Sequence, residues 1–151
     1  MNKETQLTWF YASVSILAGA AVNLLGDRLL GVRLEYFFGV YTFSPLWILD
    51  LFVVPFFAGL TVSMIYGLGG KLLCYFAPIV ARVWSYYEAV YLIDLPEGYL
   101  ILPIYYWVML LIVAVEAAAF GGVAGEILVK KTYGRRPRHL VYKERVKDEK
   151  L

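Results

Sequence analysis

Residues 44–93 read SPLWILDLFVVPFFAGLTVSMIYGLGGKLLCYFAPIVARVWSYYEAVYLI, and this stretch decides the fold. It contains two apolar segments, 45–68 and 72–93, joined by Gly69-Gly70-Lys71. Each segment is long enough to cross a bilayer as a helix, which takes about twenty apolar residues. A connection this short permits only an antiparallel hairpin of two helices. The sequence therefore predicts an integral membrane protein.

The wider composition agrees with a membrane environment. Hydrophobic residues make up 61% of the 151 residues and charged residues 17%, whereas soluble domains are about half apolar and a quarter charged. Residues 1–129 carry five basic and nine acidic side chains, and residues 130–151 carry nine and three. We expect a transmembrane domain over 1–129 and a basic cytoplasmic tail over 130–151. The tail is expected to contact anionic lipid headgroups through Lys130, Lys131, Arg135, Arg136 and Arg138.

Four segments are expected to span the bilayer, at about 7–25, 45–68, 72–93 and 99–129. They predict an all-α fold, a membrane four-helix bundle. Residues 26–43 are too charged to cross and are expected at the membrane surface, as an amphipathic helix or as a small hairpin. Lys and Arg near the ends of the spans gather on the side of the two termini. Both termini are therefore expected in the cytoplasm, with the protein in the cytoplasmic membrane.

Small residues recur at four-residue spacing on three of these spans. Residues four apart share one face of a helix. A face of small side chains lets a neighbouring backbone approach closely, which is how many membrane helices associate. We therefore expect helix packing at Ser15, Gly19 and Asn23, at Gly59, Ser63 and Gly67, and at Ala117, Gly121 and Gly125.

Arg82 and Glu116 are the charged residues expected to lie deepest in the membrane. With a rise of about 1.5 Å per residue, the two fall at nearly the same level on the third and fourth spans. An unpaired charge in hydrocarbon costs several kcal/mol, so an ion pair between Arg82 and Glu116 is predicted. We interpret it as an architectural pair. A proton or ion pathway and a docking contact to another membrane subunit are the alternatives.

Asp50 and Glu88 form a second candidate polar site, on the outer side. Each lies five residues from the outer end of its span, and Tyr86 and Tyr87 are close in sequence. Two carboxylates held at one level favour the binding of a cation or a proton. The simpler interpretation is that both reach water or headgroups.

Several chemistries are not expected from this chain. Cys74 is the single cysteine and His139 the single histidine, so no disulfide, metal-ligand or haem-ligand set is present in the sequence. No nucleophile and base can be identified, and we expect neither an enzyme nor a cofactor. The basic tail is explained by its place beside the membrane, so nucleic acid is not an expected partner.

The function expected from these features is that of a small structural, accessory or assembly subunit. It would associate with the lipid bilayer and with other membrane subunits or with itself. The alternative is an oligomeric carrier or channel for an ion, a proton or a small solute, which would use Arg82, Glu116, Asp50 and Glu88. A cavity that reaches Arg82 favours transport, whereas dry pairing and an outward-facing stripe of small residues favour the subunit.

The expected topology can be tested by cysteine accessibility in a background that lacks Cys74. A cysteine introduced in the tail should react with impermeant reagents only from the cytoplasm. Cysteines at 94–98 should react only from outside, because the Lys and Arg distribution places that turn there. Labelling of both regions from one side would exclude four spans.

Overall fold

The computed structural model describes residues 3–134 and Lys147, and it is mostly helical. Arg135, Arg136, Arg138 and His139, and most of the expected tail, lie outside the described residues. The all-α class is confirmed. In chain order the elements are α1 (Lys3–Leu30), β1 (Tyr36–Phe37), α2 (Pro45–Tyr66), α3 (Gly70–Leu73), α4 (Phe76–Tyr87), the π-helix η1 (Glu88–Leu92), β2 (Leu100–Ile101) and α5 (Ile104–Tyr133).

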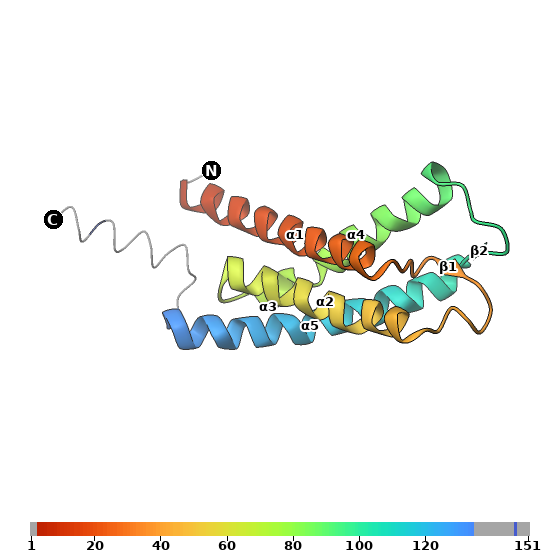
Figure 1. Ribbon diagram of the computed structural model, residues 1–151. Helices are drawn as coiled ribbons and strands as arrows, with labels where there is room; N and C mark the ends of the chain where they lie inside the picture. The colour runs from red at the N-terminus through yellow and green to blue at the C-terminus, as the bar shows by residue number, and fades with distance from the viewer. Residues whose placement is uncertain (1–2, 135–146, 148–151) are drawn as a thin grey trace.

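The long helices pack around α2, which contacts α5 most extensively and α1 next. Figure 1 shows α1, α2 and α5 running along the bundle, with the start of α1, the α2–α3 turn and the end of α5 at the same end. The opposite end carries β1, β2 and their loops. We call the first the terminal end and the second the strand end. From the α3 region, α4 runs toward the strand end and diverges from α2 and α5.

In the part of the chain that the structure describes, three helices are long and apolar enough to cross a membrane. They are Lys3–Leu30, Pro45–Tyr66 and Ile104–Thr132, with mean hydropathy of 1.5, 2.1 and 2.1. They correspond to the first, second and fourth expected spans. Length and hydropathy of this kind are typical of membrane-spanning helices.

The third expected span, 72–93, is divided among three elements. α3 ends at Leu73, α4 begins at Phe76, and α4 passes into η1 at Glu88. Pro78 accounts for the break, because proline has no N–H to donate to the carbonyl four residues earlier and its ring clashes with that carbonyl. A proline is tolerated within the first turn of a helix, and Pro78 lies in the first turn of α4. This region is therefore not one of the three long helices.

The helix ends differ from the sequence expectation in physically simple ways. α2 begins as expected, because the Ser44 hydroxyl accepts a hydrogen bond from the Trp47 N–H at 3.2 Å and Pro45 follows it. It ends at Gly67, whose φ of 91° belongs to the left-handed region. α1 extends beyond 7–25 at both ends, and α5 begins at Ile104 rather than at 99.

Residues 26–43 contain neither a surface helix nor a local hairpin. The last residues of α1 come first, and β1 then pairs antiparallel with β2, with Tyr36 opposite Ile101 and Phe37 opposite Leu100. The Leu102 N–H also donates to the Glu35 carbonyl at 2.9 Å. The partner strand is more than sixty residues away in sequence, so no local pattern could have revealed it.

All nine small residues expected in helix packing are buried. On α2 and α5 they allow the two backbones to touch. A Cβ added to Gly59 would overlap the Ala118 carbonyl, and one added to Gly121 would overlap the Phe56 carbonyl. On α1, Gly19 leaves room for Val62 of α2. The small residues therefore set the distances between α2 and its neighbours.

A carboxylate fixes the α2–α3 turn at the terminal end. Glu126 of α5 accepts hydrogen bonds from the backbone N–H groups of Gly69, at 2.8 Å, and Lys71, at 3.1 Å. These N–H groups lie at the start of α3, where a helix has no internal acceptors for them. Glu126 therefore ties the short helix to α5.

Replacing Gly121 by leucine should destabilise the folded protein by about 1 to 3 kcal/mol, because the new side chain has no space beside the Phe56 carbonyl. Ala21→Leu is the matched control, since Ala21 is exposed on α1. Unfolding in mild detergent measures both. Equal stability of the two variants would show that α2 and α5 do not pack through Gly121.

Candidate functional site

Arg82 is the centre of a buried polar cluster. Its side chain is 1% exposed and reaches from α4 toward the strand end of α1. Nη1 donates to Glu35 Oε1 at 3.2 Å, and Nη2 donates to Asn23 Oδ1 at 3.0 Å and to the carboxylate of Asp27. One guanidinium thus joins α4, α1 and the segment before β1.

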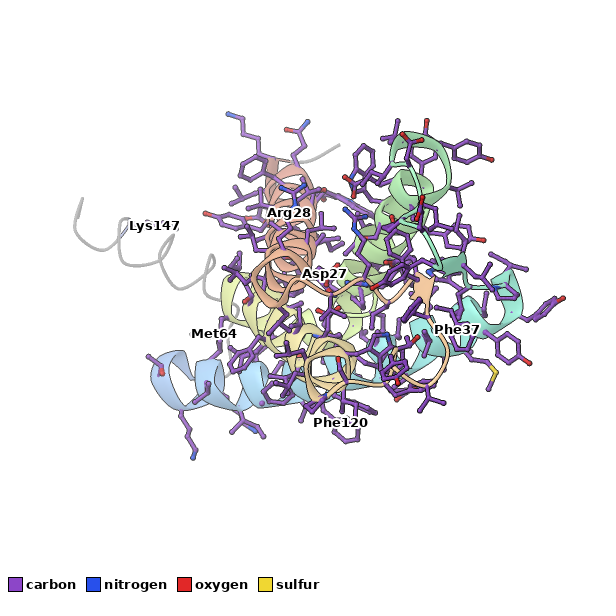
Figure 2. All side chains as sticks on the ribbon, turned by 45° about the vertical axis from the view of Figure 1, so that its right-hand side comes forward. Asp27, Arg28, Phe37, Met64, Phe120 and Lys147 are labelled. Atoms are coloured by element: carbon purple, nitrogen blue, oxygen red, sulfur yellow. The ribbon has the colours of Figure 1, made fainter. Side chains whose placement is uncertain are left out.

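Asn23 and Asp27 present their side chains together because they lie four residues apart on α1. Asn23 is fully buried, and Asp27 is 9% exposed. Figure 2 shows Asp27 on the ribbon of α1, on the side that faces the middle of the bundle, and Arg28 outside it. The same helix turn therefore directs the acid inward and the base outward.

Asp50 of α2 adds a third carboxylate to the cluster. It is fully buried, and within the described part of the chain neither of its carboxylate oxygens has a hydrogen-bond donor. Its neighbours are Asp27, whose carboxyl lies within hydrogen-bonding reach, and the charges of Arg82 and Glu35. Asp50 is therefore a buried acid that lies beside a second acid and has no donor of its own.

The charge balance of the cluster also favours a bound proton. Among the described residues, Asp27, Glu35 and Asp50 lie around one buried cation, Arg82, and all four side chains are excluded from solvent or nearly so. Burial raises the pKa of the Glu35 carboxyl above its ordinary value of 4.5. The positive charge of Arg82 acts to lower this pKa, but its effect is the smaller one. The Glu35 Oε2 atom is buried without a partner among the described residues. The cluster is thus built to hold at least one proton.

A pocket of about 820 Å³ opens beside the cluster at the strand end. Asp27 and Glu35 contribute to its lining, together with Tyr36 and Trp47. The Tyr36 hydroxyl and the Trp47 indole N–H are buried and have no partner within residues 3–134. The pocket therefore extends to Asp27 and Glu35, the two acids that pair with Arg82.

Two of the residues that line this pocket form an ion pair. Arg33 Nη1 lies 3.4 Å from Glu88 Oε2, and both side chains are partly exposed. The Arg33 guanidinium also lies over the Tyr36 ring, 5.7 Å from its centroid. Glu88 is the first residue of η1, and π-helical turns are frequent at functional sites.

Arg82 and Glu116 are not brought together. Glu116 is exposed on α5, whereas Ala114, Ala117 and Ala118 of the same helix are buried. Depth along the helices puts the two residues level, but it carries no information about which face of α5 Glu116 occupies. Residue 116 lies about 100° around the helix from residue 117, so the small-residue face that includes Ala117 already pointed elsewhere.

The candidate outer-side site is also not assembled as a unit. Asp50 joins the Arg82 cluster, while Glu88 pairs with Arg33 at the pocket rim. Tyr86 packs against Trp107 with ring centroids 4.8 Å apart, and Tyr87 is exposed and packs against Tyr91. Asp27 and Glu35 were missed because their segment was assigned to the membrane surface. The four-residue spacing of Asn23 and Asp27 was the available signal.

The fold and the site define a helical protein that has three helices of membrane-spanning character and one buried cluster of acids around an arginine. No protein-family model matches the chain, and no curated protein or solved structure is detectably similar to it. The function must therefore be argued from the site.

Arg82→Met should destabilise the protein in detergent by roughly 3 kcal/mol or more, because it leaves buried carboxylates without their cation. Adding Asp27→Asn should recover part of this loss. Glu116→Gln should instead be additive with Arg82→Met, because the two residues are not in contact. A double-mutant cycle by thermal or denaturant unfolding distinguishes the cases, and coupling to Glu116 rather than to Asp27 would contradict this site.

Proposed function

We propose that the chain is a multi-pass protein of the cytoplasmic membrane that crosses the bilayer four times. Besides the three long helices, α3, α4 and η1 form a nearly continuous helical path over residues 70–92, long enough for a broken third span. Lys3, Lys71, Lys130 and Lys131 lie at the terminal end, while Asp94 and Glu97 lie between η1 and β2. This distribution supports cytoplasmic termini, with the two lysines at the end of α5 beside anionic headgroups.

Within this topology we propose that the protein binds and transfers protons, as a carrier or channel does. The observation that carries the proposal is the cluster of Asp27, Glu35 and Asp50 around the single Arg82, next to the pocket. Ionisable groups inside a membrane are costly, and they commonly serve proton relays. By the criterion of a cavity that approaches Arg82, transport is favoured over a purely architectural role.

A proton suits this cluster better than a metal ion. Within the described residues no group of three or more His, Cys, Asp or Glu side chains is arranged to hold a metal. The guanidinium already occupies the space between Asp27 and Glu35. A proton on the buried carboxyl of Asp50 needs no further room.

Access to the cluster is asymmetric, which a carrier requires. The pocket reaches Asp27 and Glu35 from the strand end. Toward the terminal end, the fully buried side chains of Ala58, Val62 and Ala77 close the space around Gly19. This arrangement corresponds to a state open on the outer side only, and release to the cytoplasm needs separation of α1, α2 and α4.

An accessory or assembly subunit is the second candidate. Its support is the exposed position of Glu116 on an otherwise apolar face of α5. The stripes of small residues turn inward, so they offer no surface for a partner. The two functions are compatible in one protein.

Proton transfer can be tested in liposomes that contain the purified protein and an internal pH indicator. With a potassium diffusion potential imposed, the wild type should acidify the interior, and Asp50→Asn should behave like protein-free vesicles. Glu97→Gln, in an exposed loop, is the matched control. Infrared spectra should contain a protonated-carboxyl band that Asp50→Asn removes. Normal acidification by Asp50→Asn would refute the proposal.

A further inference from the structure

Glu116 takes no part in the buried cluster around Arg82. Glu116 lies near the middle of α5 and is exposed. The exposed side chains one and two turns away along the same face are large and apolar, with exposed fractions of 63% for Met109, 56% for Ile112, 71% for Phe120 and 47% for Val123. We call this surface, residues 109, 112, 116, 120 and 123, the α5 outer face.

A carboxylate in this position conflicts with its surroundings if α5 spans the membrane. A side chain that is exposed at the middle of a membrane span faces hydrocarbon, where an ionised group costs several kcal/mol. Within residues 3–134 Glu116 makes no ion pair, and the buried cation Arg82 is paired with Asp27 and Glu35. Intramembrane acids usually face the bundle interior and are paired. The described bundle therefore supplies no cation for Glu116.

We propose that the α5 outer face docks a transmembrane helix of another protein, and that this helix presents a Lys or Arg side chain to Glu116. Charge complementarity supports this occupant, because an ion pair removes the cost of the carboxylate in hydrocarbon. The large apolar residues on both sides of Glu116 supply the packing surface. The proposal rests on the membrane-spanning assignment of α5 and is independent of proton transfer.

Among the described residues, a second copy of the chain does not offer the required group. Within the described residues Arg82 is the cation nearest the middle of a helix, and it is buried and paired. Lys3, Lys71, Lys130 and Lys131 lie at the terminal end, and Arg28 and Arg33 lie toward the strand end. A symmetric pair of α5 helices would instead place two glutamates opposite each other.

The test uses site-specific photo-crosslinking of the full-length protein in native membranes. A benzophenone amino acid replaces Phe120 on the α5 outer face. In the matched control it replaces Leu17, which is 63% exposed on α1, a helix without substantial contact to α5. The probe at 120 should give one adduct with a membrane protein that the probe at 17 does not give. Mass spectrometry should place the cross-link in a transmembrane segment that contains Lys or Arg.

The role of the charge is tested with Glu116→Gln in the same background. The adduct at 120 should fall about tenfold, as expected when one member of a desolvated charge pair is removed. Glu97→Gln should leave it unchanged. Glu116→Lys together with an acidic residue in place of the partner's Lys or Arg should restore it. Purified Glu116→Gln should keep the unfolding temperature of the wild type, because Glu116 has no partner inside the bundle.

Four results would overturn the proposal. They are an adduct with a second copy only, an adduct with lipid only, a partner segment without Lys or Arg, and an adduct yield that does not respond to Glu116→Gln. None of these results bears on proton transfer, which is measured with the isolated protein. Failure of the docking proposal and failure of the proposed function are therefore distinguishable.

Discussion

The strand end of this protein depends on the guanidinium of Arg82. Within residues 3–134 it is the buried cation among three buried carboxylates, and it connects α4 to α1 and to the segment that leads into β1. A buried charge is tolerated only when its partners are arranged closely around it. The course of residues 28–37 follows from this requirement, because Glu35 must be carried back from the end of α1 to the guanidinium. The pairing of β1 with β2 then holds that segment in place.

Two kinds of contact hold the helices together, close backbone packing and polar contacts. Below the cluster, α2 meets α5 and α1 through glycines and alanines, so that backbone touches backbone. This packing depends on shape, and the polar side chain of Ser63 that it includes is small. At the strand end the helices diverge, and polar side chains fill the additional space. The pocket forms at this boundary, where a close-packed bundle gives way to a polar one, and Asp27 belongs to both regions.

Hydropathy and length were sufficient to predict the long helices, and four-residue spacing was sufficient to predict residues such as Gly59 and Gly121 at their contacts. The same reasoning did not find the division at Pro78, because an apolar run has the same composition whether its helix is continuous or broken. It also paired Arg82 with Glu116, since depth along a helix carries no information about rotation around it. The true partners Asp27 and Glu35 lie in a segment whose path is fixed by contacts distant in sequence.

The order in which the chain is synthesised gives the Arg82 cluster a further consequence. Asn23, Asp27, Glu35 and Asp50 all precede Arg82, so α1 and α2 leave the ribosome with their acids before the balancing cation exists. Until Arg82 is synthesised, the acids of α1 and α2 lack the cation that pairs with Asp27 and Glu35 in the folded protein, and unbalanced charge is costly in hydrocarbon. A nascent chain that stops before residue 82 is an incomplete substrate for the membrane, and it is exposed to membrane-bound proteases and insertases. Arg82 is therefore needed to complete the assembly of the helices as well as to balance the acids of the folded site.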